Sequence, residues 1–67
     1  MRLTKKHAGR SVDFRDARNP QNIINGRIDF VRHGVARIVY WLPNEPSPPN
    51  GFSWWADVRD PRIVAIY

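Results

Sequence analysis

The sequence contains no cysteine, so neither a disulfide nor a thiolate metal site can stabilise the chain. It also lacks long apolar runs. The longest, residues 38–42 and 63–67, fall far short of the ~20 residues that a membrane-spanning helix needs. Residues 1–7 are basic, but no apolar stretch follows them as it does in a signal peptide. These absences predict a cytoplasmic protein that has no membrane partner.

Groups suited to catalysis are equally sparse. The two histidines, His7 and His33, stand in no metal-binding spacing, so no metal site is expected. No serine lies in a Gly-x-Ser-x-Gly context, and there is no glycine-rich phosphate loop. Acids such as Asp57 and Asp60 each have an arginine within two residues, which favours solvated ion pairs. We therefore predict no enzymatic activity, no catalytic residue and no cofactor; a small-barrel enzyme formed only as an oligomer is an alternative.

Positive charge, by contrast, is plentiful and uneven. The net charge is +5, and most Lys and Arg residues lie within residues 1–37. Most of these cations are arginines, which make bidentate contacts with phosphate and stack on rings. The predicted nucleic-acid-binding residues are Arg2, Lys5, Lys6, Arg10, Arg15, Arg18, Arg27, Arg32 and Arg37.

The chain length allows one domain. With 67 residues it lies near the lower size limit for folding alone, yet 42% of its residues are hydrophobic, which is too many for a disordered chain. Residues 1–9 are predicted to form a flexible basic tail, and residues 10–67 a single small domain. The tail either follows a phosphate backbone or only keeps the protein soluble, and the sequence leaves both interpretations open.

Alternating apolar and polar residues predict β-structure almost throughout. The expected antiparallel strands lie near residues 10–15, 23–31, 35–42, 52–58 and 62–67. Strands this short bury a core only by curling over on themselves, so the predicted all-β fold is a small five-stranded SH3-like barrel. An OB-type barrel usually needs more chain.

Glycine and proline mark the connections. Gly34 is expected in the left-handed region of a hairpin turn at residues 32–34. Residues 43–51 form a proline-stiffened loop, and Asp60-Pro61 is a break that suits one 3₁₀ turn. The Asn25-Gly26 pair is either a turn or a bulge at Gly26.

Two short segments resemble known families. The Trp54-Trp55 pair is similar to the paired tryptophans of signalling SH3 domains, but the acidic first loop and the Gly-x-x-Pro-x-Asn-Tyr stretch of that family are absent. Val64-Ala65-Ile66-Tyr67 is similar to the Val-Gln-Ile-Tyr of plasmid-borne small-barrel dihydrofolate reductases, with Ala65 in place of the Gln. Neither resemblance exceeds five residues, so no family is assigned and no binding residues are carried over.

The aromatic residues divide between the two faces of the predicted strands. The inward set, predicted to be core, is Phe14, Phe30, Tyr40, Phe52 and Trp54. Trp41 and Trp55 have the opposite phase and are predicted to form an aromatic contact patch. They are either exposed or covered by residues 43–49, and the sequence does not decide between these.

Two arginines flank the predicted hairpin turn. Arg27 and Arg37 are expected to share one face, near Val39 and Asp29. A cationic sheet face with aromatic neighbours is a common nucleic-acid surface in small barrels. The alternative is that both arginines point outward and pair with Asp29 and Asp57.

Together these features predict a non-enzymatic binding module for nucleic acid, DNA or RNA, acting as a small regulatory or accessory protein. The alternative is a protein–protein interaction module, such as a phage- or plasmid-encoded effector, that docks Trp41 and Trp55 on a larger host protein. The Pro-x-x-Pro spacings of residues 43–49 either stiffen the loop or form a polyproline ligand. Homo-oligomerisation through an edge strand is a further expectation.

Overall fold

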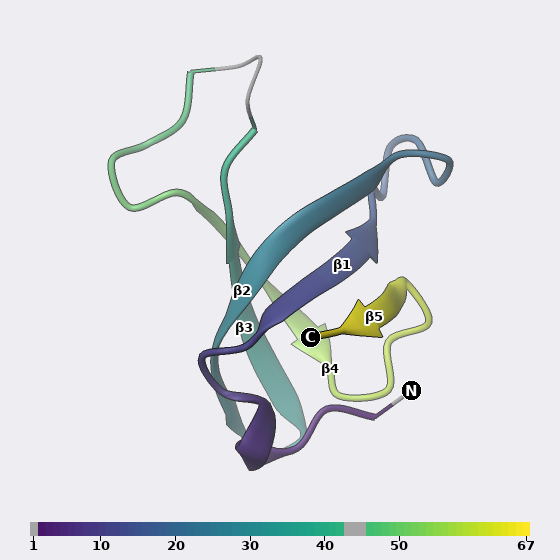
Figure 1. Cartoon of the computed structure of the whole chain (residues 1–67), viewed down its shortest axis with the longest axis vertical. Helices are drawn as coiled ribbons and strands as arrows, with labels where there is room; N and C mark the ends of the chain where they lie inside the picture. The colour runs from purple at the N-terminus through teal and green to yellow at the C-terminus, as the bar shows by residue number, and fades with distance from the viewer. Residues whose placement is uncertain (1, 43–45) are drawn as a thin grey trace.

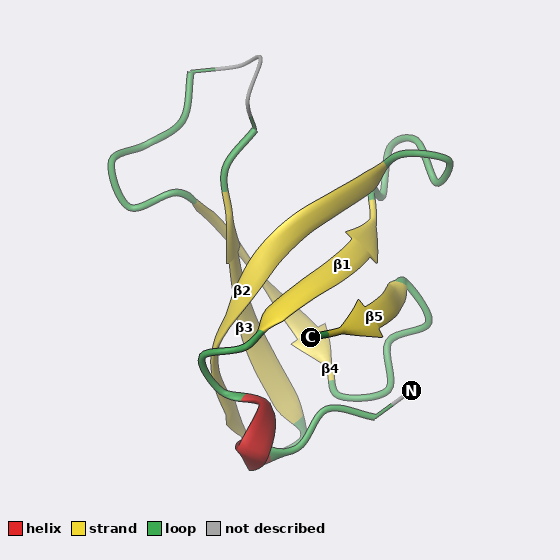
Figure 2. Cartoon of the chain, in the orientation of Figure 1, coloured by secondary structure: helices red, strands yellow, loops and turns green. Residues whose placement is uncertain are grey.

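The computed structural model describes residues 2–42 and 46–67 (Figure 1). A single-turn 3₁₀ helix, η1 (Lys5–His7), precedes five strands (Figure 2). The strands are β1 (Ser11–Arg15), β2 (Ile23–Arg32), β3 (Val35–Tyr40), β4 (Phe52–Asp57) and β5 (Ile63–Ile66). They form one antiparallel sheet in the order β4-β3-β2-β1-β5. The predicted all-β fold and its strands are thus confirmed.

The sheet curls without closing. Long β2 bends across the molecule, so that β3 and β4 lie behind β1 and β5 in the view of Figure 1. Within the described residues β4 and β5 form no ladder, and each keeps one unpaired edge. The SH3-like barrel expected from the sequence is therefore not confirmed, and self-association through an edge stays a prediction. No helix in residues 2–42 and 46–67 has the length and apolarity to cross a membrane.

A two-residue turn joins β2 to β3. His33 and Gly34 have φ of 53° and 80°, which is the left-handed pair that a tight hairpin of this twist requires. The turn fixes the register, so Arg32 pairs with Val35 and Val31 with Ala36. The expected left-handed conformation of Gly34 is confirmed.

The core lies on the concave inner side of the curled sheet. Its buried members are Leu3, Val12, Phe14, Ile28, Ala36, Ile38, Ala56, Val58 and Ile63. Tyr40 and Trp54 pack against them, with ring centroids 5.3 and 5.2 Å from that of Phe14. Gly26 also faces inward, and a Cβ there would lie 2.8 Å from the Val39 carbonyl oxygen. Gly26 is thus needed for close packing of β2 on β3. It lies in neither the turn nor the bulge that the sequence had suggested as alternatives.

A bulge at Asp29 changes which residues of β2 face the core. Ile28 pairs with Ile38, but Phe30 pairs with Arg37, so Asp29 is an extra residue on its strand. Beyond the bulge Val31 turns inward and Phe30 turns outward. The prediction that Phe30 belongs to the core is wrong, because period-two alternation does not continue through a bulge. Phe52 is partly buried, stacked on Tyr40 with centroids 5.6 Å apart, and lies outside the buried cluster.

The N-terminal segment packs on the sheet, which differs from the expected flexible tail. Leu3 is 2% exposed, and its N–H donates to the Val58 carbonyl over 2.8 Å. Gly9 donates to the Ile28 carbonyl over 2.6 Å. Burying a leucine stabilises a fold by about 1.5–3 kcal/mol, which is enough to hold this short segment. The turn expected near Asp60 is present: the Ile63 N–H donates to the Asp60 carbonyl over 3.2 Å, which closes a single turn that does not extend into a 3₁₀ helix.

Candidate functional site

The outer side of β2, β3 and β4 presents aromatic rings beside arginines. The register places Phe30, Arg37 and Trp55 opposite one another across the three strands. We call this surface the aromatic–arginine face; it comprises Arg27, Phe30, Arg32, Arg37, Trp41 and Trp55. The face exists because outward positions alternate with the buried Ile38 and Ala56, and because the Asp29 bulge adds Phe30 to it.

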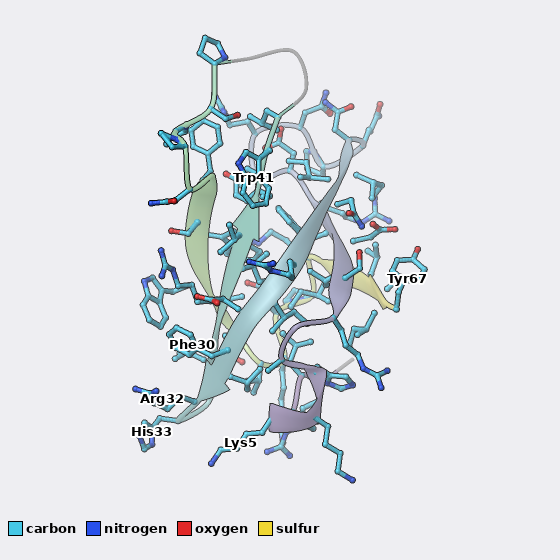
Figure 3. All side chains as sticks on the ribbon, turned by 60° about the vertical axis from the view of Figure 1, so that its left-hand side comes forward. Lys5, Phe30, Arg32, His33, Trp41 and Tyr67 are labelled. Atoms are coloured by element: carbon cyan, nitrogen blue, oxygen red, sulfur yellow. The ribbon has the colours of Figure 1, made fainter. Side chains whose placement is uncertain are left out.

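Trp55 is the most exposed tryptophan of the face. Its side chain is 60% exposed, and the Phe30 ring meets it edge-on with centroids 5.4 Å apart and planes at 71°. The Arg32 guanidinium carbon lies 5.2 Å from the Phe30 centroid. In Figure 3, Phe30 lies on β2 and Arg32 lies further along the same strand, closer to the tip of the β2–β3 hairpin. An indole that packs against a neighbouring ring and is mostly exposed to solvent is a platform on which a planar group can stack.

Arg37 is held loosely beside this platform. Its Nη1 lies 3.6 Å from Asp29 Oδ2, with both side chains about 40% exposed, and its Nη2 donates to Ser53 Oγ over 3.4 Å. Such a long, solvated ion pair contributes little and can exchange for another anion. The predicted pairing with Asp29 is therefore confirmed for Arg37. The Asp57 carboxylate instead accepts a hydrogen bond from the Arg59 N–H over 2.8 Å.

Arg27 and Arg37 share a face, as predicted, and line one hollow of about 340 Å³. The other lining residues include Asp29, Val39 and Trp41. Trp41 is 47% exposed; its ring lies so close to Gly51 that a Cβ there would be 2.7 Å from Cε2. Both tryptophans of the predicted contact patch are thus exposed, and Trp41 also packs on the end of the proline-rich loop. Residues 43–45 of that loop lie outside the described residues.

The remaining predicted cations are divided among other places. Arg2 and Lys5 lie with Arg32 around a second hollow at the hairpin tip. Lys6 and Arg10 are exposed on the N-terminal segment, and Arg18 in the β1–β2 loop. Arg15 donates to the Pro20 carbonyl over 2.9 Å and lines a hollow near Trp54 at the other end of the molecule. The structure therefore brings together only part of the predicted set on each surface.

Two participants were not predicted from the sequence: Phe30 on the face, and His33 beside it. A signal for the bulge was present. A two-residue turn at His33-Gly34 pairs Val31 with Ala36, so Val31 must share the inward phase of Ala36. Ile28 is also apolar, but it lies three residues before Val31, so regular alternation would place the two side chains on opposite faces of the sheet. Both point inward only if one extra residue lies between them.

Two side-chain contacts near the C-terminal end of the chain stabilise the fold. Tyr67 Oη donates to Asp13 over 2.6 Å, which lowers the pKa of Asp13 and raises the pKa of Tyr67. Asn25 Nδ2 donates to the same carboxylate over 2.9 Å and also lowers the pKa of Asp13. Asp60 accepts from Arg62 over 3.0 Å, which lowers the pKa of Asp60. The Arg62 guanidinium also lies 4.2 Å from the Trp54 ring. The Tyr67–Asp13 bond attaches the end of the chain to β1, and the Arg62–Trp54 contact attaches the β4–β5 loop to β4.

Within residues 2–42 and 46–67, no three His, Asp or Glu side chains gather closely enough to hold a metal ion. Comparisons with models of protein families, with curated proteins and with solved structures found no match to this chain.

Proposed function

We propose that the protein binds single-stranded nucleic acid on the aromatic–arginine face. The proposal rests on the exposed Trp55 indole, which packs against the Phe30 ring. Arg32 lies over that Phe30 ring, and Arg37 lies opposite Trp55 on β3. Proteins that hold single strands combine aromatic platforms for bases with cations that follow the backbone. Unpaired bases expose their flat faces, whereas those of a duplex are already stacked.

In the proposed mechanism one base stacks on Trp55, while Arg27, Arg32 and Arg37 neutralise neighbouring phosphates. The Asp29 carboxylate releases Arg37 when phosphate arrives, because the 3.6 Å pair is long and solvated. Stacking and charge are tolerant of sequence, so the expected binding has weak base preference and steep salt dependence. The protein then acts as an accessory factor with no chemistry of its own.

The finer fold assignment is also a proposal. We infer an SH3-like barrel left open between β4 and β5. The strand order β4-β3-β2-β1-β5, the tight β2–β3 hairpin and the curl of β2 support it. In such a fold the outer side of β2, β3 and β4 is left free for a ligand.

The test is fluorescence anisotropy of labelled oligo-dT and oligo-U at about 50 mM and about 150 mM salt. Arg27→Glu/Arg37→Glu should weaken binding about tenfold or more, because two phosphate contacts become repulsive. The control Arg18→Glu/Arg59→Glu changes the net charge equally in the loops after β1 and β4. Equal losses in both variants, or unchanged binding after the first, would exclude the face.

A protein partner is the second candidate, favoured by the exposure of two large rings, Trp41 and Trp55, on the same side of the sheet. Binding of this kind depends on apolar burial and varies little with salt. A complex that forms without nucleic acid, persists at high salt and is lost in Trp55→Ala would favour this reading.

A further inference from the structure

A basic hollow lies at the hairpin tip, next to the aromatic–arginine face. Its volume is about 230 Å³, and the N-terminal segment and the β2–β3 turn form its walls. Four of its lining residues carry or can carry positive charge: Arg2, Lys5, Arg32 and His33. Figure 3 shows the last three gathered at this end of the molecule.

None of the described residues that line this hollow has a carboxylate, in contrast to the Arg27–Arg37 hollow, which contains Asp29. Among the described residues, Arg2, Lys5 and Arg32 form no ion pair. Like charges brought together without a counter-ion repel one another. An anion in the hollow removes that repulsion and adds charge-assisted hydrogen bonds.

Apolar packing holds these cations in place. Leu3, which lies between Arg2 and Lys5 in the sequence, is buried in the core. Its N–H donates a hydrogen bond to the Val58 carbonyl. Thr4 donates its N–H to His7 Nδ1 over 2.9 Å, which fixes the next turn of chain. The segment is therefore fastened beside Arg32 and His33 despite the charge repulsion, and the hollow is formed before any ligand arrives.

We propose that the hollow binds a phosphate monoester, supplied by the phosphorylated end of a single strand. A monoester carries roughly −1.5 to −2 charge at neutral pH, whereas an internal phosphodiester carries a single charge, so the cation cluster suits the monoester better. The hollow is smaller than the ~300–1,000 Å³ of pockets that enclose whole ligands, so it takes a phosphate group and some water rather than a nucleotide.

The hollow adjoins the stacking surface, which explains why a strand end fits. Arg32 lines the hollow and also lies over Phe30, whose ring contacts Trp55. A terminal base on Trp55 thus has its phosphate near Arg32. The identification of a strand end as the source of the phosphate rests on the proposed function, whereas phosphate binding in the hollow does not.

The first experiment uses inorganic phosphate as the probe, with chloride at equal ionic strength as the control. In ¹⁵N-resolved NMR spectra, phosphate should shift the amides of Lys5, His33 and Gly34, and saturate. Lys6 and Arg10 belong to the same segment but do not line the hollow, so Arg2→Gln/Lys5→Gln should abolish the shifts and Lys6→Gln/Arg10→Gln should leave them.

The second experiment compares oligo-dT with a 5′-phosphate, a 3′-phosphate or two hydroxyl ends. One phosphorylated form should bind about fivefold or more tightly than the hydroxyl form, and Arg2→Gln/Lys5→Gln should remove the preference while Lys6→Gln/Arg10→Gln retains it. Phosphate shifts without oligonucleotide binding would uphold the hollow and reject the proposed function. Oligonucleotide binding without end preference or phosphate shifts would reject the hollow alone.

Discussion

Trp54 and Trp55 are consecutive residues with similar surroundings, but Trp54 is half-buried and Trp55 is exposed. Each ring meets a phenylalanine at a similar distance, Phe14 at 5.2 Å and Phe30 at 5.4 Å. Each pair also has an arginine over one of its rings. Yet Trp54 packs against the core, whereas Trp55 is 60% exposed.

Strand phase, rather than local composition, therefore determines whether each ring packs on the core or faces solvent. Trp54 buries apolar surface and stabilises the fold. Trp55 contributes little burial, and most of its ring is exposed to solvent. The two sides of β4 can therefore be tested separately, one by stability and the other by binding.

The largest expected effect is that of Trp54→Ala. Removing this ring should lower the free energy of unfolding by about 3–5 kcal/mol, because it leaves a cavity beside Phe14 and Tyr40. Trp54→Phe is the milder control, since Trp54 Nε1 has no hydrogen-bond partner among the described residues. Urea unfolding measures both. A loss under about 1 kcal/mol for the alanine variant would contradict the assignment of Trp54 to the core.

Trp55→Ala should give the reverse pattern. Unfolding free energy should change by less than about 1 kcal/mol, since surface substitutions have small effects. Affinity for oligo-dT should fall about tenfold, as expected for one stacked base. Trp55→Phe keeps a flat ring and should retain most of the binding. Severe unfolding of Trp55→Ala would instead make Trp55 a structural residue.

Arg62 and Arg32 allow the same comparison between the two sides of β4, with smaller expected effects. Arg62→Gln removes the cation above Trp54 and the pair with Asp60, and should cost about 1 kcal/mol of stability. Arg32→Gln removes the cation above Phe30 and should weaken oligonucleotide binding while leaving stability nearly unchanged. Thermal unfolding and anisotropy on the same samples separate the two outcomes. Similar stability losses would show that both arginines are structural.

The smallest effect concerns acid stability. Hydrogen bonds from Tyr67 and Asn25 hold the pKa of Asp13 below the ordinary aspartate value of 3.8. The stabilisation is thus present above that value and is lost as the pH falls through the lower pKa of the folded state. Asp13→Asn should therefore reduce the stability difference between pH 7 and acidic pH. An unchanged acid limb of the unfolding curve would show that this contact is not maintained in solution.

Much of the sheet could be predicted, because period-two patterns and glycine or proline breaks are local signals. The left-handed turn at Gly34 is of this kind. The Asp29 bulge required comparing the parity of Val31 with that of Ile28 across the hairpin. The packing of Leu3 was hidden because a single apolar residue in a basic segment has no periodicity. Sheet closure depends on long-range geometry between β4 and β5, which no local pattern encodes.

The most direct test follows the indole N–H signals of the three tryptophans in NMR spectra during titration with oligo-dT. We predict a large, saturable shift for Trp55 that weakens with salt, and little change for Trp54. A shift centred on Trp54 with Trp55 unmoved, or no shift at low salt, would contradict the claim that the outer side of β4 binds nucleic acid.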